Sequence, residues 1–398
     1  MESKKIAIIT HAFGACTFPV AKRLAMLGYQ VDFFEICLDV ITEFECFVSK
    51  PIPTKWGIHA INTEWYQGLD EYMGDVKINY YYCRIPRPYT RVPVVRDVAD
   101  MKLRRRIRKF CRFIDNKKYD CVWGVGAYNN SYFAYIYGYL KTPMVMLLHE
   151  VVNHYDPKYE AQTPLMKTIF NRQIDLIVPS HNTASQVINY KGAVEARIHI
   201  ANLGLSEINR YIPNEHLHDD LKDFVFYFGS LLPYKGINVL YEAIDRHPDC
   251  LGGRLLVLAG GGNEDIVNKF RNLPNVVVIP RRMPVTEMVE LIQNSYVQVM
   301  PYITASQSGI PLAVYVFGKP IVATRIPSLM DYVKDEENGL ICEINDPDDL
   351  ARQLKRITTD EDLYSKCCQN VFKFVQNYPE FSWDASTKTI AEVLEKYM

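Results

Sequence analysis

Two polar loops in the second half of the chain contain residue types that can bind a phosphate group. The loop from Phe228 to Gly236 includes Lys235, whose ammonium group can place a point charge on a diphosphate; the alternative is a solvated lysine. The loop from Pro301 to Gly309 precedes an expected helix, so its backbone N–H groups can bind an anion; the alternative is helix capping by serine. The candidate residues are Gly229, Ser230, Lys235, Ser306, Gln307, Ser308, Gly309 and Ile310.

Two further loops in the first half follow apolar runs. Gly14, at the end of the loop that starts with Thr10 and His11, could let the backbone approach a phosphate or a sugar; the alternative is a simple turn glycine. His149 and Glu150 follow a buried run and point to the same expected site. His149 could donate a hydrogen bond to a sugar hydroxyl or a phosphate, and the alternative is a histidine satisfied by the backbone.

Alternation of strand-like and helical runs must position these loops. The expected strands are 5–10, 31–36, 121–126, 143–148, 176–179 and 198–201 in the first half, and 224–228, 254–259, 276–279, 297–300 and 320–324 in the second. Such alternation predicts α/β halves with parallel sheets covered on both faces. Ligands then bind beyond the carboxyl ends of the strands. Residues 11–19 are expected to form a loop, 20–27 and 387–397 helices, and 211–223 a linker.

Composition excludes several classes of protein. A length of 398 residues favours two domains, and the net charge of −1 argues against a nucleic-acid binder. The 10 cysteines include no CxxC pair, which makes a zinc framework improbable. The first ten residues lack the features of a secretory signal, and no apolar run reaches the roughly 20 residues of a membrane span, so we expect a cytoplasmic protein. The Asp346-Pro347-Asp348 motif is interpreted as a helix cap rather than a metal pair.

Several motifs together resemble the retaining glycosyltransferases of the GT-B fold, specifically family 4 (glycosyl transferases group 1). The matching segments are PYKG at 233–236, similar to an EKG element; PY at 301–302 with SQSG at 306–309, a variant of one branch; FGKPIVAT at 317–324; NGLI at 338–341; Arg281, similar to the arginine of an RYIP element; and FSW at 381–383, similar to the crossover into a last helix.

The resemblance implies two Rossmann-like domains that face a central cleft. Residues 1–208 would bind the acceptor, 209–376 the nucleotide sugar, and 377–398 would return to the N-terminal domain. A sugar would pass with retention to a glycan, a lipid-linked or another acceptor in polysaccharide biosynthesis, without a metal, a cofactor or a protein nucleophile.

The same resemblance implies roles for individual residues. Lys235 and the N–H groups of Ser308 to Ile310 would stabilise the departing diphosphate, and His149 would orient the sugar. Gly14 and Arg281 join the expected donor-binding residues, whereas His11 and Glu150 are candidates on the acceptor side.

Some positions depart from the family pattern. The two glutamates usual around the donor are replaced by Ala305 and Ala313, so the ribose contact of the second glutamate is lost. The arginine before the lysine is replaced by Ser230. The missing glutamates support one alternative, a non-catalytic partner in a glycan assembly complex. Another alternative is a GT-B sugar-nucleotide epimerase. A nicotinamide oxidoreductase is disfavoured because the glycines at 260–262 lack the dinucleotide spacing.

Residues 102–118 combine dense basic residues with apolar residues at helical spacing. The basic residues are Lys102, Arg104, Arg105, Arg106, Arg108, Lys109, Arg112, Lys117 and Lys118. A basic amphipathic helix can lie on an anionic membrane surface, and the alternative is a sheet-covering helix with a solvated face. The expected partners are therefore a nucleotide-sugar donor, a glycan or lipid-linked acceptor and an anionic membrane surface.

Overall fold

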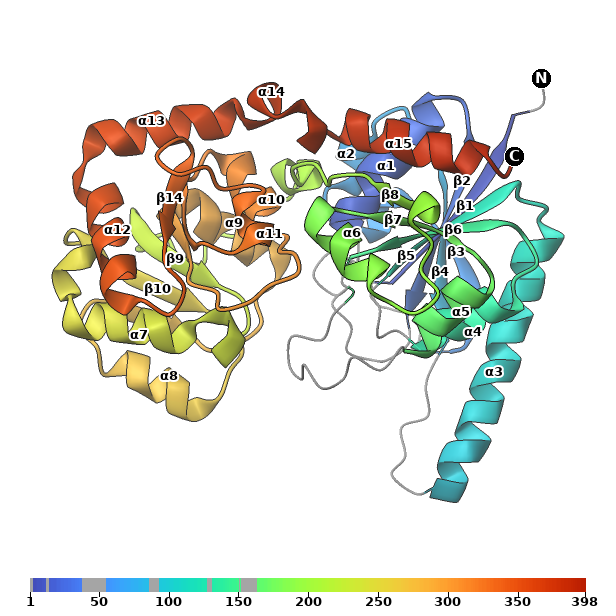
Figure 1. Ribbon diagram of the computed structural model, residues 1–398, viewed down its shortest axis with the longest axis horizontal. Helices are drawn as coiled ribbons and strands as arrows, with labels where there is room; N and C mark the ends of the chain where they lie inside the picture. The colour runs from blue at the N-terminus through green and yellow to red at the C-terminus, as the bar shows by residue number, and fades with distance from the viewer. Residues whose placement is uncertain are drawn as a thin grey trace. The chain divides into compact units, whose positions relative to one another are not determined.

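The computed structural model describes residues 3–11, 14–37, 55–85, 93–126, 131–149, 151 and 163–398. The chain divides into two compact units. Unit 1 contains Met1–Asn153, Pro157–Tyr211 and Glu380–Met398, and unit 2 contains Ile212–Pro379. The end of the chain therefore belongs to the same unit as its beginning (Figure 1).

Unit 1 is built on a sheet that has eight strands within the described residues, in the order β3-β4-β2-β1-β5-β6-β7-β8. All neighbours pair in parallel except β3 with β4, which are antiparallel. The strands are β1 (Lys5–Thr10), β2 (Gln30–Cys37), β3 (Gly57–Ile61), β4 (Asn79–Arg84), β5 (Cys121–Gly126), β6 (Met144–Leu148), β7 (Asp175–Val178) and β8 (Ile198–Ile200).

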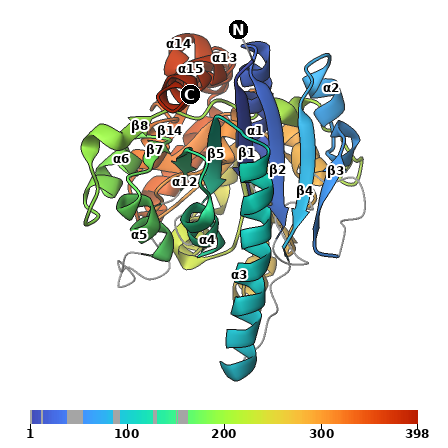
Figure 2. The same cartoon turned by 90° about the vertical axis from the view of Figure 1, so that its right-hand side faces the viewer.

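Helices cover both faces of this sheet (Figure 2). They are α1 (Gly14–Met26), α2 (Leu69–Met73), α3 (Pro93–Asn116), α4 (Ser131–Tyr139), α5 (Pro164–Asn171), α6 (His181–Ile188) and α15 (Trp383–Glu395), with 3-10 turns η2 (Thr63–Trp65), η3 (Glu195–Arg197) and η4 (Glu207–Arg210). One core layer joins α3, α4 and α5 to the sheet through residues such as Phe34, Ile107 and Met166. On the other face Phe18 of α1 packs on Phe33 and Tyr66.

The prediction of a loop over residues 11–19 was wrong, because α1 begins at Gly14. The helix contains Pro19, which has no N–H to donate to the preceding turn. Burial outweighs that loss, since Phe18, Ala21 and Leu24 are spaced three residues apart and are all buried.

Unit 2 has a parallel sheet of six strands in the described part of the chain, in the order β11-β10-β9-β12-β13-β14. The strands are β9 (Phe224–Phe228), β10 (Leu256–Ala259), β11 (Val276–Ile279), β12 (Ser295–Met300), β13 (Ile321–Thr324) and β14 (Gly339–Cys342). The helices are α7 (Ile237–Arg246), α8 (Glu264–Arg271), α9 (Val285–Asn294), α10 (Ile310–Val314), α11 (Pro327–Met330), α12 (Pro347–Thr359), α13 (Glu361–Phe372) and α14 (Phe374–Asn377), with 3-10 turns η5 (Pro233–Lys235), η6 (Pro248–Leu251) and η7 (Tyr315–Phe317). The expected pair of parallel-sheet α/β halves is thus confirmed.

Strand order marks one point in each sheet where a ligand can bind. In unit 2 the chain winds one way from β9 to β11 and the other way from β12 to β14, so the direction reverses between β9 and β12. In unit 1 the reversal lies between β1 and β5. The loops beyond the carboxyl ends of strands at such a reversal form a crevice in open α/β sheets.

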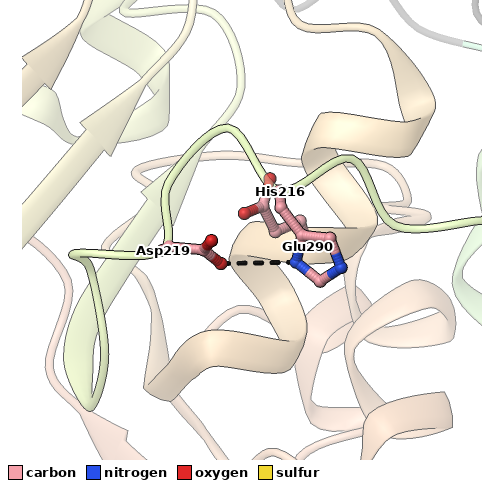
Figure 3. A group of neighbouring side chains, drawn as sticks. All are labelled: His216, Asp219 and Glu290. Carbon is pink, nitrogen blue, oxygen red and sulfur yellow. Dashed lines mark ion pairs between the residues drawn. The ribbon is translucent and has the colours of Figure 1, made fainter.

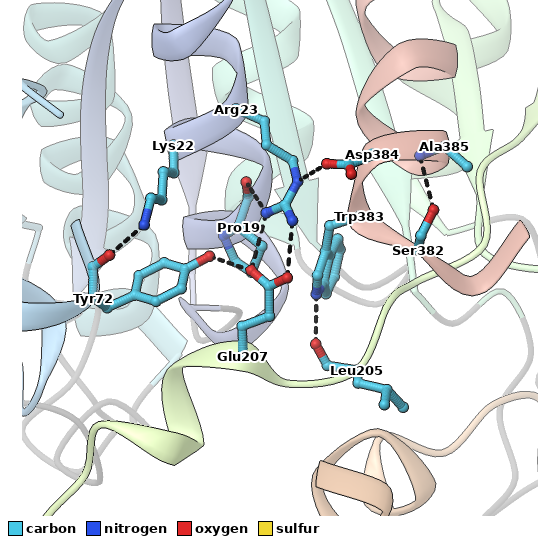
Figure 4. Close-up of polar contacts among 10 residues, drawn as sticks. All are labelled: Pro19, Lys22, Arg23, Tyr72, Leu205, Glu207, Ser382, Trp383, Asp384 and Ala385. Atoms are coloured by element: carbon cyan, nitrogen blue, oxygen red, sulfur yellow. Dashed lines mark hydrogen bonds and ion pairs between the residues drawn. The ribbon is translucent and has the colours of Figure 1, made fainter. Parts of the chain in front are cut away.

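Helix α15 is fixed to unit 1 by polar contacts (Figure 4). The Trp383 indole N–H donates to the carbonyl oxygen of Leu205 at 2.5 Å. Arg23 of α1 binds Asp384 at 2.5 Å and Glu207 of η4 at 2.9 Å. One guanidinium group therefore joins the segment just before the chain leaves unit 1 to the segment just after it returns.

Among all described helices, none combines the length and apolar character needed to cross a membrane.

Candidate functional site

The carboxyl ends of β9 and β12 bring two of the expected polar loops together. Lys235 ends the turn η5 after β9, and its ammonium group donates a hydrogen bond to the Tyr302 hydroxyl at 3.0 Å. The backbone N–H groups of Ile303 and Thr304 approach the carbonyl oxygen of Tyr234 at 2.8 and 3.3 Å. The two loops therefore form one surface at the reversal point of the sheet, with a cation on it.

Glycine is required where these loops meet. Gly236 has a φ of 68°, and a β-carbon there would lie 1.6 Å from the carbonyl oxygen of Pro301. Gly229 has a φ of 132°, and a β-carbon there would lie 3.6 Å from the Lys235 ammonium nitrogen. Bare backbone at Gly236 thus lets the loops close, whereas at Gly229 the 3.6 Å distance is an ordinary contact and the positive φ is what favours glycine.

The SQSG segment follows β12 as expected, and its serines are buried. Ser306 and Ser308 are both buried, and the Ser308 hydroxyl accepts the N–H of Ile310 at 3.3 Å. The N-cap of α10 is Gly309, which has no side-chain cap bond, so the expected alternative of a serine cap is not what this contact forms. The contact does occupy the Ile310 N–H, one of the groups expected to bind an anion. The helix that follows, α10, is short, and Gln307 and Gly309 precede it. Ala313 is buried within it, so this position offers no carboxylate for a ribose.

Arg281 is engaged in a bidentate ion pair within unit 2. Its guanidinium group binds both oxygens of Glu287 at 2.6 and 2.7 Å, and His218 hydrogen-bonds to the same carboxylate at 2.7 Å. Burial would raise the pKa of Glu287, but the hydrogen bonds from Arg281 and His218 outweigh it and lower the pKa below its usual value. A donor contact of Arg281 stays a prediction.

A second cluster joins His216 and Asp219 of the expected linker to Glu290 of α9 (Figure 3). His216 Nδ1 lies 3.3 Å from Asp219 Oδ1. The buried Glu290 carboxylate accepts the backbone N–H groups of Leu217 and His218 at 3.1 and 2.9 Å. Glu290 therefore holds the expected linker onto α9, and we interpret the cluster as one that stabilises the fold.

The expected residues of unit 1 lie at the carboxyl edge of its sheet. His11 follows β1, and its Nδ1 hydrogen-bonds to the carbonyl oxygen of Ile36 at 2.8 Å. His149 follows β6, is 6% exposed, and its backbone N–H donates to Gly126 at 3.1 Å. Gly14 is the first residue of α1 rather than a loop glycine, and Glu150 lies outside the described residues.

Sequence reasoning missed Glu35 at this edge. Glu35 is 1% exposed on β2, opposite Thr10 of β1 in the parallel register, and it accepts a hydrogen bond from the Tyr66 hydroxyl. Burial raises its pKa to about 8, although the Tyr66 hydrogen bond lowers it. The run QVDFFEIC contained a signal, because Glu35 shares the strand face of the buried Phe33.

Comparisons with known proteins agree with this arrangement. Residues 209–374 match the family model of glycosyl transferases group 1. An uncharacterized glycosyltransferase of Methanocaldococcus jannaschii is 26% identical over 178 residues, covering 44% of this chain and 48% of that protein. A D-inositol 3-phosphate glycosyltransferase of Corynebacterium urealyticum is 25% identical over 275 residues, covering 62% of this chain and 63% of that protein. The chain thus spans about half to two thirds of the length of these relatives.

Solved structures resemble the whole chain. The Anabaena HepE structure in complex with UDP and glucose superposes with a TM-score of 0.67 at 16% identity, covering 99% of this chain and all of that one. Sucrose-phosphate synthase of Thermosynechococcus elongatus gives a TM-score of 0.66 at 17% identity, covering 99% and 98%. The comparisons therefore show a GT-B fold for the chain and support a glycosyl transferases group 1 domain in residues 209–374.

Proposed function

We propose that the protein is a retaining glycosyltransferase that moves a sugar from a nucleotide-sugar donor to an acceptor in glycan or polysaccharide biosynthesis. One observation carries the proposal: Lys235 lies at the reversal point between β9 and β12, inside the part of the chain that matches the group 1 family. The names of the relatives support the transferase class. The UDP complex of HepE supports a nucleotide sugar as donor, and a uracil base is the first to test.

In the proposed reaction the sugar–phosphate bond breaks and negative charge develops on the departing diphosphate. The Lys235 ammonium group stabilises that charge, and the backbone N–H groups around Ser308 and Gly309 add to it. The leaving phosphate oxygen accepts the proton of the acceptor hydroxyl. The acceptor oxygen forms a bond to the anomeric carbon on the face from which the diphosphate departs, so the configuration is retained. No protein nucleophile and no metal enter this proposal, and His149 binds a sugar hydroxyl.

The replaced glutamates at Ala305 and Ala313 are what favours a non-catalytic role, and an epimerase is the other alternative. The relatives are named as glycosyltransferases, which favours transfer. One assay separates the three possibilities. Incubation with a nucleotide sugar gives nucleoside diphosphate from a transferase, an epimeric nucleotide sugar from an epimerase, and neither from a non-catalytic partner.

A thermal-shift panel of UDP-, GDP- and ADP-sugars tests donor binding. A donor present at 100 times its dissociation constant should stabilise the protein by about 2.7 kcal/mol. Lys235→Ala should lose most of that shift, because the diphosphate loses its cation. If no nucleotide sugar shifts the unfolding temperature of the unaltered protein, the proposed function is wrong.

We also propose that α3 places the protein on an anionic membrane surface on the cytoplasmic side, where a lipid-linked acceptor would be reached. Figure 2 shows α3 extending well past the strands of its unit. Its buried side includes Ile107 and Ile114, whereas Met101 and Val98 are 64% and 42% exposed. Met101 is followed by Lys102, and Arg105 lies one helical turn after it. Exposed apolar residues next to basic ones are what an interfacial helix needs.

Binding to liposomes tests this surface. The protein should bind vesicles that contain anionic lipid and should detach as salt is raised. Changing Arg105 and Arg112 to Gln should weaken binding by about 10-fold or more, because each basic residue near the surface contributes about 1 kcal/mol. Changing Lys366 and Lys373 of unit 2 to Gln removes the same charge and should leave binding unchanged. Equal loss in both variants would show that α3 is not the binding surface.

A further inference from the structure

Lys235 and Tyr302 meet because the loops that carry them are held together on three sides. The backbone of the second loop donates to Tyr234, Gly236 packs on Pro301, and the Thr324 hydroxyl donates to the Tyr302 carbonyl oxygen at 2.6 Å. Tyr302 is 2% exposed, so the surrounding residues hold its ring in one position. The lysine side chain is the movable member of the pair.

Two contacts fix the lysine against this ring. The Lys235 ammonium nitrogen lies 3.0 Å from the Tyr302 hydroxyl and 4.5 Å from the centre of the ring. A hydroxyl that accepts from an ammonium group leaves the positive charge intact, whereas a carboxylate would neutralise it. No second hydrogen bond of this ammonium group is found within the described residues, which leaves its other two N–H bonds for an anionic ligand.

We infer that Tyr302 is a positioning residue, which orients the Lys235 ammonium group through its hydroxyl and keeps that charge uncompensated for the diphosphate of the donor. This inference rests on the proposed function. Lysine has large rotamer entropy, so an ammonium group that is already held binds an anion with a smaller entropic loss. Ala305 and Ala313 provide no carboxylate at this site. The Tyr302 hydroxyl is therefore a neutral partner of the ammonium group where a charged residue could have stood.

Tyr302→Phe tests the inference because it keeps the ring and removes only the hydroxyl. The measurement is the dissociation constant of UDP, GDP and ADP by calorimetry for the unaltered protein, Tyr302→Phe, Lys235→Ala and the double variant. Tyr302→Phe should weaken the tightest nucleotide by about 3- to 10-fold, the effect of immobilising one flexible side chain. Lys235→Ala should weaken it by about 10- to 100-fold.

Coupling between the two changes distinguishes positioning from a structural role. In the double variant, loss of the hydroxyl should add less than about 2-fold to the effect of Lys235→Ala, because the group that it positions is gone. Tyr315→Phe is the matched control, since this buried tyrosine of the same unit donates to Tyr332 at 3.3 Å. It should leave the dissociation constant unchanged.

Three outcomes overturn the inference. If Tyr302→Phe binds as tightly as the unaltered protein, the hydroxyl does not orient the lysine. If the two changes multiply in the double variant, Tyr302 acts independently of Lys235; in both cases the proposed function survives. If none of the three nucleotides binds the unaltered protein, both the proposed function and the inference are wrong.

Discussion

Glu35→Gln should stabilise the protein at alkaline pH and leave it unchanged at acid pH. Glu35 lies on β2 with 1% of its surface exposed, and the Tyr66 hydroxyl donates to one of its oxygens. Its second carboxylate oxygen is buried without a hydrogen-bond partner among the described residues. Glutamine has the same shape, can accept from Tyr66 and cannot ionise, so it removes only the titration.

The pKa values give the magnitude and the sign. Burial raises the pKa of Glu35 from 4.5 to about 8, although the Tyr66 hydrogen bond lowers it. Between these pH values the folded protein keeps the proton and the unfolded chain has lost it, so stability falls as pH rises from about 4.5 to about 8. At about 1.4 kcal/mol per pKa unit, the loss is on the order of 5 kcal/mol in total.

Calorimetric unfolding of both proteins from pH 4 to pH 9 measures this difference. The curves should coincide near pH 4 and separate until about pH 8, with Glu35→Gln more stable. Glu287→Gln is the control of opposite sign: the folded pKa of Glu287 is lowered, so its stabilisation is present above about 4.5 and lost as pH falls. A constant difference for Glu35→Gln across the pH range would refute the reasoning.

Two further substitutions test the loop junction and the attachment of α15. Gly236→Ala should destabilise unit 2 by more than about 2 kcal/mol and abolish nucleotide binding, because its β-carbon would meet Pro301; Gly253→Ala, with positive φ but open space, should cost about 1 kcal/mol. Equal unfolding temperatures for the two would contradict the loop contact. Arg23→Met should cost about 2 kcal/mol in thermal unfolding, because two carboxylates lose their cation. Arg246→Met removes only exposed pairs, with Glu242 and Asp348, and should cost less than about 1 kcal/mol. Similar values would show that the Arg23 network does not hold α15.

Apolar runs were sufficient to predict most of the sheet strands, because strands buried on both faces are almost continuously apolar. The edge strands β3 and β14 and the strand β4 were not predicted. β14 is a short strand with the run GLIC. The residues of β3 are half exposed, and β4 has the run NYYYCR, so neither has the expected pattern. Likewise, Pro19 suggested a loop, but this segment is helical because one side of α1 is buried. Asp346 caps α12 as predicted.

Site residues on a short loop after a strand were easier to predict than those that depend on strand pairing. Lys235 and the SQSG segment follow single strands, so their position at the carboxyl edge could be expected. The contact of Lys235 with Tyr302 depends on β9 lying beside β12, and sequence order does not give that neighbour. Glu35 and Thr10 face each other for the same reason, through the register of β1 and β2.

Turnover of a nucleotide sugar by the unaltered protein and by Lys235→Ala tests the central claim most directly. The measurement follows release of nucleoside diphosphate and the anomeric configuration of the product by NMR. We predict that the unaltered protein transfers the sugar with retention and that Lys235→Ala is slower by roughly 100-fold, the effect of losing one donor to the developing charge. Equal turnover by the two proteins, or an inverted product, would contradict the account.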